Sequence, residues 1–171
     1  MGHSARVAVI GVGNEFRRDD GVGWAVIRLL RDRASLRPLP PGTVLSVSDG
    51  EPARLIGLWE DTALTVVVDA VRTGPGRPGR VHRLAARDTE LPGAGAATSH
   101  GLGFGEAVEL ARALGRLPRH LCVYAVEAAD TSLGTGLTPA VEAAVRPLAE
   151  RVEDEVRRHH GTAAARRSTR R

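Results

Sequence analysis

The sequence contains no lysine, and this absence excludes several large classes of enzyme. All 24 basic residues are arginine. A P-loop nucleotide site needs a lysine on the phosphates, and Schiff-base catalysis needs a lysine amine. The sequence also has neither a Gly-x-Ser-x-Gly nucleophile motif nor a His-Glu-x-x-His zinc motif. These classes are therefore excluded before any motif is considered.

Cysteine, aromatic residues and long apolar runs are also scarce. A lone Cys122 cannot form an intrachain disulfide, which is typical of a reducing compartment, so we expect a cytoplasmic protein. Aromatic residues make up 3% of the chain, so the core must be built from valine, leucine, alanine and isoleucine. No apolar run approaches the length of about 20 residues that crosses a bilayer. No signal peptide is indicated before the first apolar run, and we expect no membrane association.

The positive charge is concentrated at the carboxyl end of the chain. Six arginines and no acidic residue follow Val156, whereas the other 18 arginines are outnumbered by 20 acidic residues. No aromatic residue accompanies these last arginines, so stacking on nucleic-acid bases is not indicated and we expect no nucleic-acid partner. We predict a single domain over residues 1–160, followed by a basic, disordered tail over residues 161–171.

Short apolar runs alternate with helical patterns along the chain. Strands are predicted at residues 7–10, 43–48, 64–68, 80–84 and 121–126. Helices are predicted from Asp20 onwards and over residues 52–59, 101–114 and 139–158. About ten residues separate the third strand from the fourth, too few for a crossover helix, so the fourth strand should run antiparallel. The pattern predicts an α/β fold with a mostly parallel sheet covered by helices on both faces.

Polar residues follow several of the predicted strands. In an open parallel sheet, ligands bind just beyond the carboxyl ends of the strands. We expect Asp20, Asp49 and Asp69 to converge there, with Glu127 after the last strand. His100, at the start of a predicted helix, can join them. Two carboxylates and an imidazole suit a divalent metal such as zinc or nickel, and the carboxylates equally suit acid–base catalysis on a peptide bond.

Each of these residues also has an ordinary structural interpretation. Asp19 or Asp20 is suited to capping the helix that follows. Asp49 precedes a glycine, which is a common turn pair, and His100 is suited to a cap or a turn. Asp69 is harder to explain in this way, because a charge at the end of a buried strand needs a partner or a function.

Four segments of the sequence together resemble the motifs of the hydrogenase maturation proteases. They are residues 11–23 (GVGNEFRRDDGVG), 66–70 (VVVDA), 99–103 (SHGLG) and 136–141 (GLTPAV). The family motifs read Gly-x-Gly-Asn followed by Asp-Asp/Glu-Gly-x-Gly, an apolar strand closing on Asp-Ala, Ser-x-His-x-x-Gly or a close variant, and Gly-Leu-Thr/Ser-Pro-x-Val. The resemblance covers roughly residues 6–150, with the four segments in family order.

The resemblance implies an activity, a fold and a set of site residues. Members of the family cut a short C-terminal extension from the precursor of the nickel–iron hydrogenase large subunit after nickel has been inserted. Their metal-binding acid, aspartate and histidine correspond to Asp20, Asp69 and His100, and the two aspartates are also expected to be catalytic. Asn14 and Asp49 are expected to contact the substrate. The nickel is expected to be that of the substrate, without an organic cofactor. The family fold is a three-layer α/β/α sandwich with a five-stranded mixed sheet, one strand antiparallel.

Two other functions stay open from the sequence. Gly11 and Gly13 follow a strand and precede a helix, as in a dinucleotide-binding site. Phe16, however, stands where the third glycine is required, and the helix begins several residues too late to hold a pyrophosphate. The chain could also be a non-catalytic assembly factor that binds a hydrogenase precursor without cutting it. Whichever function holds, we expect a monomer, because no exposed apolar stripe is evident.

Overall fold

The computed structural model describes residues 6–87 and 103–168. Its strands are β1 (Val7–Val12), β2 (Thr43–Ser48), β3 (Leu64–Val71), β4 (Val81–Arg87) and β5 (His120–Glu127). Its helices are the short 3-10 helix η1 (Arg18–Gly21), α1 (Val22–Leu36), α2 (Pro52–Trp59), α3 (Gly103–Ala113) and α4 (Pro139–Ser168).

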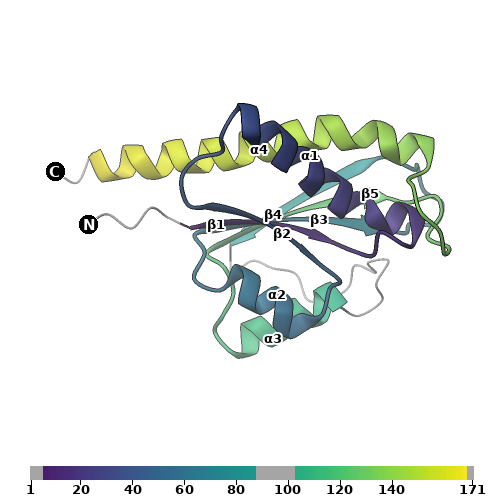
Figure 1. Cartoon of the computed structure of the whole chain (residues 1–171). Coiled ribbons are helices and arrows are strands. Elements are labelled where there is room, and N and C mark those ends of the chain that lie inside the picture. Colours follow the sequence, from purple (N-terminus) through teal and green to yellow (C-terminus); the bar gives the residue numbers. More distant parts are fainter. Residues whose placement is uncertain (1–5, 88–102, 169–171) are drawn as a thin grey trace.

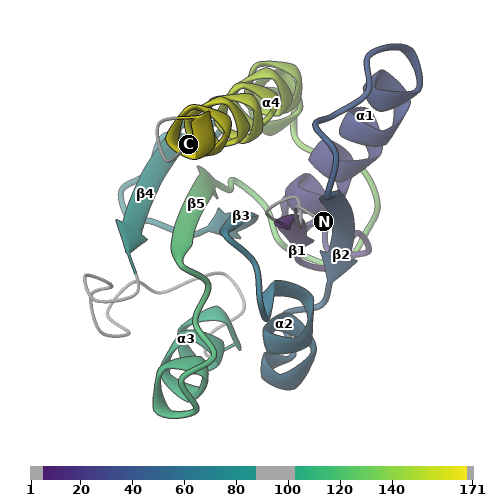
Figure 2. The same cartoon turned by 90° about the vertical axis from the view of Figure 1, so that its left-hand side faces the viewer.

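The five strands form one mixed sheet in the order β2-β1-β3-β5-β4. β1, β2, β3 and β5 are parallel, and β4 is antiparallel to β5, as the short β3–β4 connection predicts. α1 and α4 cover one face of the sheet (Figure 1). α2 and α3 cover the other face, as the view along the sheet shows (Figure 2). The predicted three-layer α/β/α class with one antiparallel strand is confirmed.

The two faces of the central strands form two separate apolar layers. Alternate residues of a strand project to opposite faces, so a run of valines in β3 supplies both. Val66 and Val68 belong to the layer under α1 and α4, whereas Val67 packs with Leu55 and Trp59 of α2. All five side chains are buried. A strand buried on both faces reads as a continuous apolar run, which explains the sequence of β3.

Two glycines bring the start of α1 directly onto the sheet. A Cβ atom on Gly11 of β1 would lie 2.3 Å from the carbonyl oxygen of Gly23 in α1. A Cβ atom on Gly23 would lie 2.6 Å from the carbonyl oxygen of Val68 in β3. Only glycine permits such a close approach of two backbones. As a result η1, which immediately precedes α1, sits at the carboxyl ends of β1 and β3 and contacts β3.

The carboxyl end of the chain differs from the prediction. The helix predicted to end near Arg158 continues to Ser168, so the expectation of a disordered tail is wrong for residues 161–168. The hydroxyl of Thr162 donates to the carbonyl of Arg158 at 2.9 Å, and three alanines with high helix propensity follow. This last part of α4 projects beyond the sheet (Figure 1). Across the described residues, no helix is both long and apolar enough to cross a bilayer.

Candidate active site

The loops that follow β1 and β5 are joined at the carboxyl edge of the sheet. The backbone amide of Arg18 donates to the carbonyl of Gly134 at 3.0 Å, and the amide of Gly134 donates to the carbonyl of Phe16 at 2.9 Å. Arg17 and Gly134 form an isolated parallel bridge. These contacts hold the segment around Asp20 in place, although the two loops are more than a hundred residues apart in the sequence.

Asp19 anchors the loop after β1 to the segment that leads into α4. Its side chain is fully buried. Oδ2 accepts hydrogen bonds from the amides of Ala129 and Asp130 at 2.8 and 3.0 Å. Oδ1 accepts one from the amide of Thr138 at 2.7 Å, and the Thr138 hydroxyl lies 2.9 Å from Oδ1 and 2.8 Å from Oδ2. These donors satisfy the buried charge, so Asp19 has a structural role.

Asp20, the next residue, has different surroundings. It is also buried, and its Oδ2 accepts the backbone N–H of Asn14 at 2.9 Å. The Asn14 side chain in turn accepts the N–H of Phe16 at 2.9 Å, which fixes the turn after β1. The N-cap of α1 is Gly21, so neither aspartate occupies the N-cap position. The helix-capping interpretation of Asp19 and Asp20 is therefore wrong.

Asp69 lies inside β3 rather than after its end. The predicted strand stopped at Val68, whereas β3 continues to Val71 because its pairing with β5 extends to Glu127. Asp69 is buried, with 2% of its surface exposed. By the alternation of the strand it projects to the same face as Val67, which is the face covered by α2 and α3. A buried carboxylate in the middle of an apolar strand is costly unless it has a function or a partner.

Two other predicted site residues, Asn14 and Asp49, are exposed, unlike the buried Asp20 and Asp69. Asp49 is exposed, and its Oδ1 accepts the amide of Glu51 at 3.2 Å in a local turn, as the turn interpretation predicts. Asn14 is exposed too, although its backbone holds Asp20. Contact of Asn14 and Asp49 with a substrate stays a prediction. His100 lies outside the described residues, so its predicted place beside the aspartates also stays a prediction.

Sequence reasoning missed a histidine–glutamate pair at the same edge of the sheet. His82 of β4 lies 2.5 Å from Glu127 of β5, measured from Nε2 to Oε1. Glu127 is buried and also accepts the backbone N–H of Arg77. The hydrogen bonds from His82 and then from Arg77 hold the pKa of the Glu127 carboxyl below its usual value. The antiparallel register of β4 creates this pair, and no spacing in the sequence indicates it.

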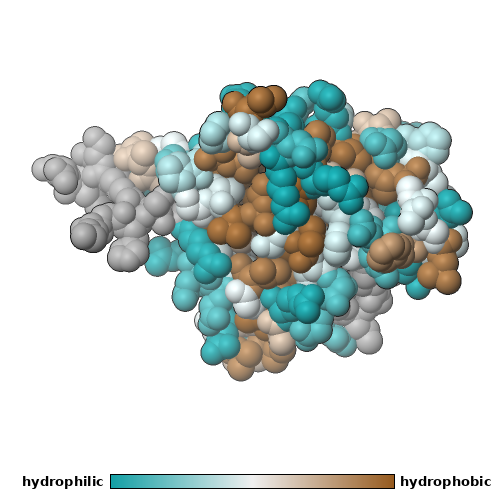
Figure 3. Space-filling view, viewed as in Figure 1, coloured by the Kyte–Doolittle hydropathy of each residue, from teal (hydrophilic) through white to brown (hydrophobic). Residues whose placement is uncertain are grey.

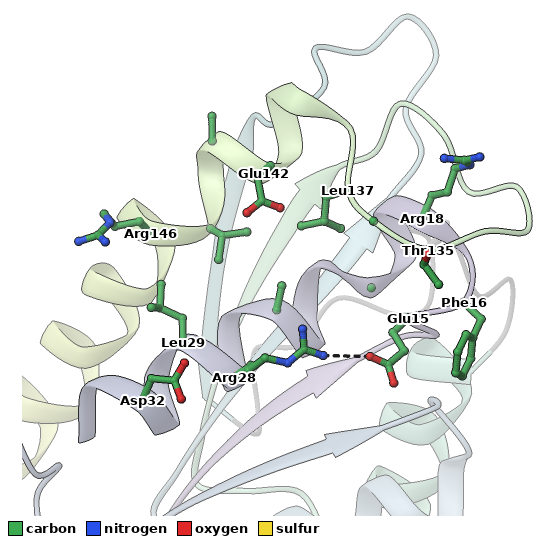
Figure 4. A pocket seen from close by; sticks show the side chains of 15 residues that line it. Glu15, Phe16, Arg18, Arg28, Leu29, Asp32, Thr135, Leu137, Glu142 and Arg146 are labelled. Atoms are coloured by element: carbon green, nitrogen blue, oxygen red, sulfur yellow. Dashed lines mark hydrogen bonds and ion pairs between the residues drawn. The ribbon is translucent and has the colours of Figure 1, made fainter. Parts of the chain in front are cut away.

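An open groove runs beside η1, between α1 and the first turns of α4. It has a volume of about 710 Å³. Leu29 and Leu137 line it together with charged side chains, among them Glu142 and the ion pair of Arg28 with Glu15 at 3.0 Å (Figure 4). The groove is lined by both apolar and charged side chains, and it reaches Gly21, the residue after Asp20.

Apolar side chains also reach the surface around the site. Figure 3 shows a broad apolar area in the middle of the view, on the side of the molecule where β2 forms the edge of the sheet. Smaller apolar areas lie near the end of the molecule that holds the loops after β1 and β5. Phe16 is 62% exposed and Leu133 is 78% exposed. Both belong to the two loops that Gly134 joins.

Comparison with known proteins identifies the family. A sequence model of the family described as hydrogenase maturation protease matches residues 40–155. The chain belongs to the hydrogenase maturation protease family. The resemblance predicted from the four motifs is thereby confirmed, and so is its classification as a peptidase. Membership also decides against the dinucleotide-binding module and the non-catalytic assembly factor.

Individual relatives agree with this assignment. The Hydrogenase 2 maturation protease of Escherichia coli K12 is 29% identical over 151 residues, which are 86% of this chain and 88% of the relative. The hydrogenase expression/formation protein HupD of Bradyrhizobium diazoefficiens is 31% identical over 147 residues, 83% of this chain and 73% of the relative. The solved structure of the hydrogenase maturating endopeptidase HybD of E. coli has a TM-score of 0.74 at 25% identity, covering 90% of this chain and 93% of that one. HybD of Thermococcus kodakarensis shares the fold, with a TM-score of 0.69 at 24% identity over 88% and 99% of the two chains.

Two of the three metal donors predicted for this hydrogenase maturation protease lie within the described residues. Asp20 and Asp69 are buried carboxylates at one edge of the sheet, and carboxylate oxygens are suitable ligands for a divalent cation. Within residues 6–87 and 103–168, no three His, Cys, Asp or Glu side chains are grouped to hold a metal ion. A third donor would come from His100, as the family motif implies.

Proposed function

We propose that this protease removes a short C-terminal segment from the large-subunit precursor of a nickel–iron hydrogenase, with Asp20 and Asp69 as its catalytic carboxylates. The observation that carries the proposal is that Asp19 and Asp20, although adjacent, have different hydrogen-bond partners. Asp19 is fully occupied by amides and a hydroxyl of the segment before α4. Asp20 is held by the turn after β1, beside the strand that carries Asp69.

Two buried carboxylates suit the proton movements of peptide hydrolysis. The oxygen of water attacks the carbonyl carbon, the C–N bond breaks, and a proton from the water ends on the leaving nitrogen. A carboxylate that accepts this proton and a carboxyl group that donates one are sufficient for the transfer. The hydrogen bond from Asn14 fixes the orientation of Asp20, and the pairing of β3 with β5 fixes that of Asp69.

The site is also proposed to recognise the nickel that the precursor carries. Asp20, Asp69 and His100 would bind that nickel as part of the substrate. A cation bound beside the scissile bond would polarise its carbonyl group. Three protein donors leave room for ligands that the precursor itself provides. This arrangement would restrict cleavage to precursors that already contain nickel.

The surroundings of the site support a protein as the substrate. Phe16 and Leu133 expose apolar surface beside Asp20, which is typical of a surface that binds another protein. We place the protein in the cytoplasm, because its one cysteine, Cys122, is a buried free thiol. We also propose that it is a monomer. Light scattering tests the monomer directly, and a mass of twice 18.1 kDa would contradict it.

Incubation of the purified protein with a large-subunit precursor tests the proposed activity. The mass of the precursor should fall by one short C-terminal peptide. Asp20→Asn and Asp69→Asn should each reduce the rate by at least about a hundredfold, because each removes a group that carries a proton or binds the cation. Asp154→Asn, on an exposed turn of α4, is the matched control and should cleave at the wild-type rate. Full activity in both site variants would refute the assignment.

A further inference from the structure

The His82–Glu127 pair lies at the edge of the sheet where β5 ends, and its glutamate is buried like the two aspartates. The Glu127 side chain is 6% exposed and the His82 side chain 38% exposed, so the glutamate is the buried partner and the imidazole reaches the surface. The loop between β3 and β4 closes over the carboxylate: a Cβ atom on Gly76 would lie 3.0 Å from Oε2 of Glu127. A carboxylate fixed in this way orients the ring that it binds.

The pair lies on the same face of the sheet as Asp69. In the register of the sheet, Asp69 of β3 is opposite Ala125 of β5, and Ala125 is opposite His82 of β4. Residues that are paired across neighbouring strands project to the same face. Asp69, Ala125 and His82 therefore form one row across the face covered by α2 and α3.

The small side chain of Ala125 lies between Asp69 and His82 in this row. Ala125 is only partly buried, and its side chain is a single methyl group. Two strand spacings separate the backbones of Asp69 and His82, which is about 9.5 Å. An extended peptide advances about 3.3 Å per residue, so this distance corresponds to about three residues of substrate.

We propose that His82, oriented by Glu127, is a positioning residue that hydrogen-bonds to the main chain of the substrate about three residues from the scissile bond. Its Nε2 is engaged by Glu127. Among the described residues, Glu127 is the hydrogen-bond partner given for the His82 ring, and the side chain is 38% exposed, so Nδ1 is the ring nitrogen left to bond an approaching peptide. The ligand is thus an extended peptide backbone that lies over Ala125. This subsite rests on the proposed function, because it takes Asp69 as the position of the cleaved bond.

Steady-state kinetics of His82→Ala on the precursor tests the subsite. Loss of one hydrogen bond made equally in the ground and transition states should raise KM about three- to tenfold and leave kcat within about twofold. His82→Gln, which keeps a hydrogen-bonding side chain, should restore part of the affinity. Leu84→Ala, two residues along the same face of β4 and 55% exposed, is the matched control and should match wild type. The affinity of uncleaved precursor for Asp20→Asn should fall by the same factor when His82→Ala is added.

A series of truncated substrates shows which side of the bond the subsite serves. Removing the residues from the third position outward on one side should abolish the difference between wild type and His82→Ala, whereas trimming the other side should leave it. A His82→Ala variant that behaves as Leu84→Ala, or one that loses kcat at unchanged KM, would overturn the subsite while the protease assignment stands. A wild-type protein that cuts no precursor would instead remove the proposed function, and the subsite with it.

Discussion

The carboxylate of Asp19 accepts the backbone N–H of Thr138 at 2.7 Å, across 119 positions of the sequence. The Thr138 hydroxyl adds a second contact at 2.8–2.9 Å. One buried side chain thereby fastens the loop after β1 to the residue before α4, so that the neighbouring Asp20 is placed by tertiary structure. The two acidic residues should consequently respond to substitution in opposite ways.

Asp19→Ala should destabilise the fold, whereas Asp20→Asn should leave the fold intact and abolish cleavage. Removing the Asp19 carboxylate leaves three backbone amides without their acceptor, which should lower the free energy of unfolding by about 3–5 kcal/mol. Urea denaturation followed by circular dichroism measures this change. The expected change for Asp20→Asn is below about 1 kcal/mol. Equal destabilisation by both substitutions would contradict the division of roles.

Gly23→Ala should be among the most damaging conservative changes in the chain. The added methyl group would meet the backbone of Val68 at 2.6 Å, and backbone atoms of a central strand cannot move aside. We expect a loss of at least about 3 kcal/mol, measured as a lower denaturation midpoint.

Gly57→Ala is the control for that substitution. In the described structure nothing lies within 4 Å of a Cβ atom at Gly57, which is an exposed position inside α2. Here alanine should raise the free energy of unfolding by up to about 1 kcal/mol, because it favours the helix more than glycine does. If both variants lost stability alike, close backbone packing at Gly23 would not be the cause.

The ion pair between Arg33 of α1 and Glu153 of α4 should make the free energy of unfolding depend on pH in the acid range. Arg33 donates two hydrogen bonds to Glu153, at 2.7 and 3.1 Å, and these hold the pKa of the Glu153 carboxyl below its usual value. The unfolded chain therefore binds this proton more readily than the folded one. The stabilisation is complete above the ordinary pKa of about 4.3 and is lost as pH falls through the folded value.

Glu153→Gln should therefore cost about 1–3 kcal/mol at pH 7, with the difference from wild type shrinking between about pH 5 and pH 3. Glu150→Gln is the matched control, because Glu150 is 52% exposed and lies 3.6 Å from the same arginine. It should cost less than about 0.5 kcal/mol. Denaturation curves at several pH values would reveal a constant difference if the ion pair were not responsible.

Cys122 should be inert towards thiol reagents in the folded protein. It is buried in β5, and burial raises the pKa of its thiol to about 11. A colorimetric thiol assay at pH 8 should detect almost no reaction until denaturant is added, and then one thiol per chain. Rapid labelling of the native protein would show that β5 opens readily.

Local sequence patterns were sufficient for the architecture and for part of the site. The valine run of β3 predicts a buried central strand, and the short connection to β4 predicts the antiparallel partner. The terminal helix was missed because the arginines after Val156 suggest a solvated chain, although a helix already formed at Pro139 extends through alanines at little cost. Charge alone is a poor guide when a packed helix precedes the charged segment.

The contacts that distinguish the acidic residues are not local, and no sequence pattern contains them. Asp19 finds its donors more than a hundred residues away, and His82 meets Glu127 through the register of two strands. The spacing of metal ligands along a sequence therefore does not indicate His82. The preference of aspartate for the N-cap of a helix gives the wrong role for Asp19. Asp20 and Asp69 were predicted from the sequence, and the structure adds that the carboxylate of the neighbouring Asp19 is engaged by the segment before α4.

Cleavage of nickel-loaded and nickel-free precursor, compared side by side by mass spectrometry, tests whether Asp20, Asp69 and His100 recognise the nickel of the substrate. We expect the wild-type protein to remove one short C-terminal peptide from the nickel-loaded precursor alone. Asp20→Asn and Asp69→Asn should remove none from either precursor. Equal cleavage of the nickel-free precursor would contradict recognition of the substrate's nickel by Asp20, Asp69 and His100. Cleavage that survives both substitutions would contradict the assignment of the site itself.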